Sequence, residues 1–183
     1  MMFCAGAAEQ AMGQWASSFA ESGLGVSKAM GDLLGPFLFA ILMGLARIGY
    51  AFSGGKIKLS RMIVYSSVLC CFCFLITALS PRPIVALAGC ALCGLSVGIL
   101  WPGTYSLAAS KISFGGVKLF AYLALAGDVG CLVGPTAAGW IAEACGNNLK
   151  ISFLLSTIFP LLILLMVYLG FRKPKNKNKG RNH

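Results

Sequence analysis

The sequence has few charged residues and very few of the groups that catalysis uses. Of 183 residues, 11% are Asp, Glu, Lys or Arg, compared with roughly 25% in soluble globular domains. Five residues are acidic, and the single histidine is the last residue, His183. The sequence offers no Ser/His/Asp set, no phosphate-binding loop and no metal-ligand cluster. We therefore expect no catalytic residue, no metal site and no cofactor, and the protein is not expected to be an enzyme.

Long polar segments are also missing, which excludes a separate soluble domain. Hydrophobic residues make up 58% of the chain, and a spanning helix needs about 20 mostly apolar residues because the hydrocarbon core is roughly 30 Å thick. Residues 1–20 begin with an apolar stretch that polar side chains then interrupt. We interpret them as a sixth span whose beginning is missing or short. The sequence predicts an all-α membrane protein with spans at about 1–20, 30–51, 60–79, 84–106, 117–141 and 150–171.

The eight cysteines do not indicate a metal site or a disulfide framework. The spacings CCFC (70–73) and CALC (90–93) resemble those of zinc ligands, but both lie inside apolar stretches. Zinc needs deprotonated thiolates with hydrogen-bonded support, which a lipid-facing helix supplies poorly. We therefore interpret these cysteines as small, polarizable packing residues.

The basic residues indicate an orientation. If the tail at 172–183 is cytoplasmic, twelve of the fifteen Lys and Arg residues lie on the inner side, and only Lys28, Arg82 and Lys150 lie outside. This follows the positive-inside rule. The tail is expected to meet anionic lipid rather than nucleic acid, so the expected partners begin with the lipid bilayer.

Two sequence motifs each occur twice, about a hundred residues apart. GDLLGP (31–36) opens the second span and GDVGCLVGP (127–135) lies in the fifth, while QWASSFAES (14–22) in the first span resembles LWPGTYSLAAS (100–110) in the fourth. Both matches have a three-span offset, which places the copies in opposite directions across the membrane. The pattern predicts two inverted three-helix repeats.

With this span count, inner tail and repeat, the chain resembles the major facilitator superfamily, specifically the C-terminal six-helix half of its sugar-permease-like members. The resemblance covers residues 1–171 and is carried by GDVGCLVGPTAAGW, by ILWPGTYSLAAS with its Pro102, and by the basic joint after the second span. That joint matches the cytoplasmic loop of the family at Gly49, Lys56, Lys58 and Arg61, with Ser53 in place of the acid.

The resemblance implies that the first and fourth spans line a central cavity. The expected substrate-binding residues, whose amides, hydroxyls and rings suit a polar solute, are Gln10, Gln14, Trp15, Trp101, Thr104 and Tyr105. The tryptophans could instead anchor the helices at the membrane interface. Glu9 is the candidate for proton coupling, with a buried hydrogen bond as the alternative, because ionisable groups inside spans are costly.

The repeated phrases are expected to serve gating. A glycine and a proline weaken a helix where it must bend, and each aspartate, near an end of its span, could accept backbone N–H bonds. The expected gating or hinge residues are Asp32, Gly35, Pro36, Asp128, Gly134 and Pro135.

These inferences predict secondary active transport of a small polar solute, such as a sugar, by alternating access. The chain would be the C-terminal half of the transporter, as a fragment with a truncated first helix. Its partners would then be the solute and an N-terminal six-helix half. The alternatives are a proton-coupled exporter of drugs or metabolites from the same superfamily and a non-transporting half-protein or remnant. The expected location is the bacterial inner membrane, with a cytoplasmic C-terminus.

Overall fold

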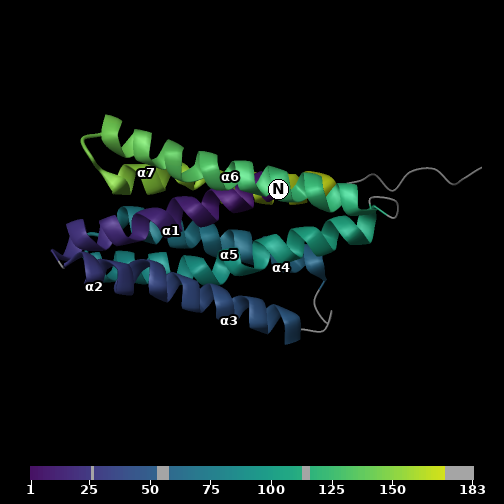
Figure 1. The fold of residues 1–183 in the computed structure, drawn as a ribbon, viewed down its shortest axis with the longest axis horizontal. Coiled ribbons are helices and arrows are strands. Elements are labelled where there is room, and N and C mark those ends of the chain that lie inside the picture. The colour runs from purple at the N-terminus through teal and green to yellow at the C-terminus, as the bar shows by residue number, and fades with distance from the viewer. Residues whose placement is uncertain (26, 53–57, 113–115, 172–183) are drawn as a thin grey trace, which may run out of the picture.

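The chain forms a bundle of long helices that run roughly alongside one another (Figure 1). The computed structural model describes residues 1–25, 27–52, 58–112 and 116–171. The helices in these ranges are α1 (Met2–Leu24), α2 (Lys28–Asp32), the π-helical segment η1 (Leu33–Phe37), α3 (Leu38–Phe52), α4 (Leu59–Leu79), α5 (Pro83–Lys111), α6 (Gly116–Ala144), α7 (Leu149–Ser156) and α8 (Ile158–Phe171). Because α2, η1 and α3 follow without interruption, and α7 and α8 are separated by Thr157 alone, the described chain crosses the bundle six times.

The predicted apolar spans are confirmed as helices. Five helical stretches in the described residues are long and apolar enough to cross a membrane: 28–52, 59–79, 83–111, 116–144 and 149–170. Their ends lie within a few residues of the predicted ends, except that the helix at 83–111 runs five residues further. Length and composition therefore support a membrane protein, as expected.

The first helix, α1, differs from the other five. It has 23 residues and carries Glu9, Gln10, Gln14 and Glu21, so its composition is too polar for it to count among the apolar spans. The structure places α1 inside the bundle, where its alanines are fully buried, among them Ala5, Ala8 and Ala11. A helix surrounded by other helices does not need an apolar surface all round, because it meets protein rather than lipid.

Two helix crossings bring backbones close together through glycine. In α5, a Cβ added at Gly94 would collide with the Phe39 carbonyl oxygen of α3, and one at Gly98 would lie 2.7 Å from the Met43 carbonyl oxygen. In α6, a Cβ at Gly134 would meet the backbone of Ala7 in α1. Without a hydrophobic effect between helices in lipid, such close approach supplies much of the packing energy.

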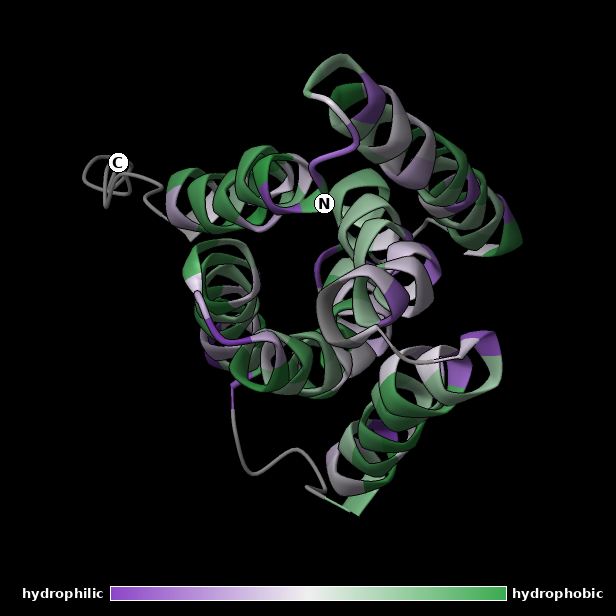
Figure 2. Ribbon diagram, turned by 90° about the vertical axis from the view of Figure 1, so that its left-hand side faces the viewer, coloured by the Kyte–Doolittle hydropathy of each residue, from purple (hydrophilic) through white to green (hydrophobic). Residues whose placement is uncertain are grey.

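These crossings set the order of the helices. Figure 1 shows α1 and α5 in the middle of the bundle, with α6 on one side and α2 and α3 on the other. Many of the large hydrophobic side chains on α3, α6 and α8 are exposed, including Leu45, Leu132 and Leu165. Seen end-on in Figure 2, the outer helices are coloured mostly as hydrophobic along their lengths. This is the arrangement expected of helices solvated by lipid.

The glycine crossings generate a stability prediction. Gly94→Ala places a methyl group against the α3 backbone, which cannot yield as a flexible side chain could, and should cost about 1–3 kcal/mol. Gly44→Ala in α3 is the matched control, because no atom lies within 4 Å of a Cβ added there. Thermal unfolding of the purified protein in detergent should show a lower midpoint for Gly94→Ala and an unchanged or higher one for Gly44→Ala. Equal midpoints would mean that the α3–α5 contact is looser than described.

Candidate functional site

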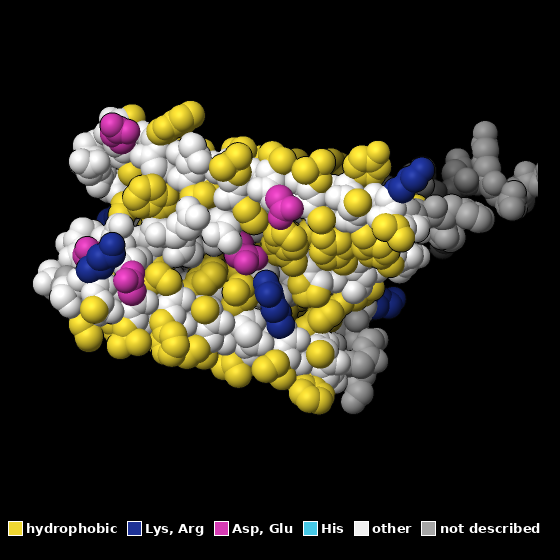
Figure 3. All heavy atoms as spheres, viewed as in Figure 1, with side chains coloured by type: hydrophobic (Ala, Val, Ile, Leu, Met, Phe, Trp, Pro, Cys, Tyr) yellow, Lys and Arg dark blue, Asp and Glu magenta, His cyan; other side chains and the backbone are white. Residues whose placement is uncertain are grey.

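An acidic and a basic side chain face each other between α1 and α3. The carboxylate Oε1 of Glu9 lies 3.8 Å from Nη2 of Arg47, and the Glu9 side chain is only 12% exposed whereas that of Arg47 is 48% exposed. Figure 3 shows acidic and basic side chains gathered near the middle of this face of the bundle, between bands of hydrophobic side chains. Charged groups so far from the helix ends are costly in a membrane and therefore indicate a functional site.

Glu9 lies next to the point where α1 crosses α6. A Cβ added at Gly6, one turn before Glu9, would collide with the carbonyl oxygen of Gly127 and would lie 2.9 Å from Sγ of Cys131. Glu9 lies three residues after Gly6 in α1, and Asp128 directly follows Gly127 in α6, so each acid is within one turn of this crossing. The crossing thus has one acid of each helix close to it, whereas Glu21 and Glu143 lie near the far ends of α1 and α6.

Trp101 of α5 reaches the same crossing. A Cβ added at Gly127 would lie 2.6 Å from Cη2 of Trp101, so the indole ring covers this glycine. Trp101 also packs against Tyr105, with ring centroids 6.4 Å apart, and Tyr105 packs against Phe120 of α6 at 5.8 Å. An aromatic wall therefore continues from the α1–α6 crossing along the contact between α5 and α6.

Two polar atoms at this site have no hydrogen-bond partner. Among the described residues, the buried side-chain atoms without a partner are Glu9 Oε2, Trp101 Nε1 and, on α4, Ser67 Oγ. A buried polar group without a partner costs about 1–3 kcal/mol, so such groups often mark a site that binds something. An acceptor on α1 and a donor on α5 could together bind a polar solute or water.

The remaining predicted substrate residues do not all lie at this crossing. Gln10 is partly buried, Gln14 is exposed and Thr104 is buried in α5. Trp15 donates a hydrogen bond from Nε1 to the Pro135 carbonyl oxygen at 3.0 Å, and its ring lies over Gly139. Gly127 and Gly139, the α6 contacts of Trp101 and Trp15, are twelve residues apart, or about 18 Å along the helix. The two tryptophans therefore occupy separate levels of α6.

A hollow lies at the level of Trp15. It has a volume of about 650 Å³ and lies between α1, α6 and the start of α7. Its walls include Trp15, Ser18, Thr136, Trp140 and Glu143. The Glu9 site and this hollow are thus two distinct polar regions, both bordered by α1 and α6.

The two acid–Gly-Pro phrases differ in structure. Asp32 ends α2 and accepts a hydrogen bond from the Ser17 hydroxyl at 2.5 Å, and Gly35 and Pro36 lie in the π-helical segment η1. Asp128 was expected near a helix end, but this was wrong: it is exposed, twelve residues from Gly116 and sixteen from Ala144 in a continuous α6. α6 begins within one residue of the predicted span and ends three residues beyond it, so Asp128 lies well inside the helix. Gly134 and Pro135 are buried within the same helix.

The predicted cytoplasmic-loop residues are only partly described. Gly49 is exposed in α3, Lys58 is the residue before α4, and Arg61 is exposed in its first turn. Lys56 and the tail at 172–183 lie outside the described residues. The cysteines of CCFC and CALC pack together in the interior, where the sulfurs of Cys70 and Cys93 lie 3.9 Å apart.

The interpretation of the sequence missed two contacts. Arg47 was counted among the inner basic residues, and its pairing with Glu9 depends on its side chain reaching from α3 to α1. The hydrogen bond from Ser17 to Asp32 joins helices that are adjacent in sequence. The one available signal was the presence of Arg47 itself within an apolar run, since such a charge needs a partner.

Comparisons with known proteins assign no family to the chain. No protein-family model matches it, and no curated protein matches it as a relative.

The Trp15 hydrogen bond predicts a measurable cost. Trp15→Phe keeps an aromatic ring over Gly139 but leaves the Pro135 carbonyl without its donor, which should cost about 1 kcal/mol. Trp140→Phe is the matched control, since Trp140 is 71% exposed. Thermal unfolding in detergent should separate the two variants, with only Trp15→Phe lowering the midpoint. A larger drop in the midpoint for Trp140→Phe than for Trp15→Phe would show that the indole–carbonyl hydrogen bond does not stabilise the fold.

Proposed function

We propose that this chain belongs to a secondary active transporter that moves a small polar solute across a membrane by alternating access. The single observation that carries the proposal is the pairing of Glu9 with Arg47 among apolar helices, with Glu9 Oε2 lacking a partner. A purely structural ion pair would be expected to satisfy all its atoms, because an incomplete one is less stable than an apolar contact. An incomplete pair is suited to a group that binds and releases a proton or solute.

The packing of the helices supports an inverted repeat of the major facilitator type. If the first three crossings correspond to the last three, α1 corresponds to α5 and α3 to α6. The α1–α6 and α3–α5 contacts are then equivalent, and both are close crossings through glycine. The site lies at the contact between the two groups of three helices, which is where such transporters bind their substrates.

The chemistry of the site suits a proton-coupled symporter. When Glu9 is ionised it attracts Arg47 at 3.8 Å, and when it binds a proton this attraction ends and the guanidinium gains freedom. A solute hydroxyl could then hydrogen-bond Glu9 Oε2 and the Trp101 Nε1–H, while Tyr105 packs against the Trp101 ring. Proton binding and solute binding would thus act on the same groups, which is a requirement for coupling two equilibria.

The proposal includes a partner half and an orientation. Alternating access requires a second bundle that rocks against this one around the site, and the exposed charges of Arg47 and Asp128 would face it. We propose that the end with Lys58, Arg61, Lys111 and Lys118 is cytoplasmic, because basic residues favour the inner side of a membrane. We propose the inner membrane of a bacterium as the location.

The coupling role of Glu9 can be tested by substitution. In the native-length protein, reconstituted in vesicles and assayed with a panel of radiolabelled neutral sugars, Glu9→Gln should abolish accumulation driven by a proton gradient. It should spare exchange of labelled for unlabelled sugar, because the amide can still hydrogen-bond the solute. Glu143→Gln is the control, since Glu143 is exposed near the end of α6. Undiminished uphill uptake in Glu9→Gln would reject proton coupling at this residue.

The need for a second half has its own test. An antibody against the peptide 172–183 should detect, in membranes of the source cells, a protein of about twice this chain's mass, or a complex of that size after crosslinking. A band and a crosslinked species that both match the chain would contradict the proposed half-transporter.

Water access should separate the proposed cavity face from the lipid face. In a Cys145→Ser background, Gln14→Cys should react with a membrane-impermeant thiol reagent, because Gln14 is exposed beside the polar residues of α1. Val68→Cys should not react, because Val68 is 52% exposed on α4 among apolar side chains that face lipid in the proposed arrangement. Labelling at Val68 as fast as at Gln14 would mean that the assignment of the two faces is reversed.

A further inference from the structure

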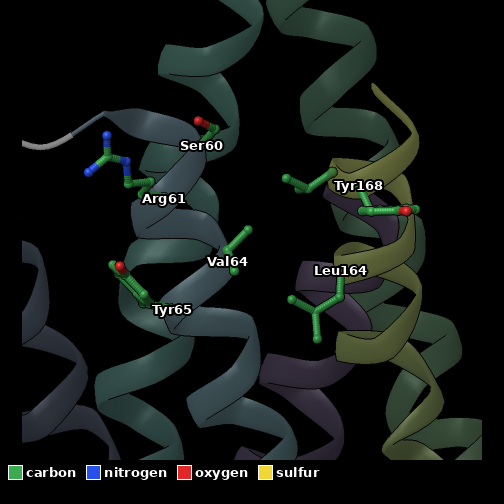
Figure 4. Close-up of a pocket in the computed structure, with 7 residues that line it drawn as sticks. Ser60, Arg61, Val64, Tyr65, Leu164 and Tyr168 are labelled. Atoms are coloured by element: carbon green, nitrogen blue, oxygen red, sulfur yellow. The ribbon is translucent and has the colours of Figure 1, made fainter. Parts of the chain in front are cut away.

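Another hollow lies between α4 and α8, away from the charged site. It has a volume of about 560 Å³ and lies between the first two turns of α4 and the last turns of α8. Its lining residues are Ser60, Arg61, Val64, Tyr65, Leu164, Val167 and Tyr168. Figure 4 shows Val64 on α4 and Leu164 on α8 directed toward the space between the two helices, with Ser60 and Arg61 further up. The hollow is therefore a groove along the helix axes.

The one charged side chain that lines this groove, Arg61, lies at one end of it. Val64, Leu164 and Val167 form its apolar walls, whereas Arg61 and Ser60 lie in the first turn of α4. Arg61 is exposed and points to the outer side of α4 in Figure 4, and its long flexible side chain can carry the guanidinium to the headgroup level. Lys58, one turn earlier, is also exposed. Tyr65 and Tyr168 are 66% and 56% exposed, as aromatic residues at a membrane interface commonly are.

We propose that this groove binds one anionic phospholipid of the leaflet in which the basic end of the bundle lies. The groove runs along the helices and hence along the membrane normal, which is the direction of an acyl chain. Its apolar walls match that chain, and the cationic end at Arg61 and Lys58 matches a phosphate group in charge and in depth. Basic pockets between helices near a membrane surface recognise lipid headgroups in this manner.

The charge pattern favours a lipid over a protein partner. A partner helix from another subunit would bury apolar contacts along the whole length of α4 and α8, and would place Arg61 in a protein interface. The observed groove occupies a short stretch at the helix ends, of about 8 Å from Ser60 to Tyr65, which is the depth of the upper part of one acyl chain. This inference requires membrane insertion but does not depend on the proposed transport activity.

Native mass spectrometry can test the lipid. The full chain would be reconstituted in vesicles of equal amounts of phosphatidylglycerol and phosphatidylcholine, and the lipids retained after extraction would be counted. The wild type should retain one phosphatidylglycerol in preference to phosphatidylcholine. Arg61→Gln should reduce that preference roughly fivefold, as expected for one basic residue near the surface, and Val64→Trp should reduce retention of both lipids by filling the groove.

The matched control is Arg82→Gln, because Arg82 is exposed before α5 at the other end of the bundle. It should keep the wild-type preference. Equal retention of the two lipids by the wild type, or an undiminished preference in Arg61→Gln, would overturn the proposal. A Val64→Trp variant that keeps its lipid but loses a protein partner on crosslinking would overturn it in favour of a helix in the groove. Circular dichroism of each variant would confirm that the bundle is folded.

Discussion

The structure depends on the close approach of backbones at two helix crossings. Lipid offers no water to drive helices together, so packing contacts and polar bonds must do so. Gly94 and Gly98 bring α5 against α3, and Gly130 and Gly134 bring α6 against α1. These contacts place α1 and α5 in the middle of the bundle. The position of every charged and aromatic group at the site follows from them.

The interior position of α1 explains how a chain this apolar can carry polar groups at mid-depth. On a lipid-facing helix, Glu9, Gln10 and Gln14 would each add to the cost of insertion. On α1 they lie among five helices that are apolar enough to meet the lipid themselves. One face of α1 is packed with alanine, which permits tight contact, and its other residues are free to be polar. The five apolar helices thus meet the lipid, and the interior helix α1 carries the polar groups of the candidate site.

Much of the fold could be predicted from the sequence, because hydrophobic length reports directly on spanning helices. The helix from 59 to 79 was predicted to within one residue. Positions within a helix were harder to predict. Asp128 was expected near an end of its span, whereas it lies twelve residues from the start of α6, which runs from Gly116 to Ala144. Trp15 and Trp101 were grouped by their repeat position, but their depth depends on where each helix crosses α6.

The candidate site was only partly predictable for a related reason. Glu9 could be predicted as a site residue because an acid within an apolar stretch is visible in the sequence itself. Its partner Arg47 lies 38 residues away in sequence, and the pairing exists because the fold brings the Arg47 side chain of α3 to within 3.8 Å of Glu9 on α1. Contacts between helices depend on small residues at the crossings, and glycine is common throughout this chain, with 23 residues. The sequence therefore does not reveal which glycines are at a crossing.

The π-helical segment η1 has a consequence for how one helix serves two neighbours. A π turn holds about one residue more than an α turn, so it rotates the faces of the helix before and after it relative to each other by roughly 100°. Before and within η1, the helix packs on α1, where Gly31 and Gly35 meet Ser17 and Ala16; after it, Phe39 and Met43 pack on α5. By turning the packing face, η1 lets one continuous helix pack on α1 before it and on α5 after it. Removing one residue there would return the helix to a single phase, so that it could match α1 or α5 but not both.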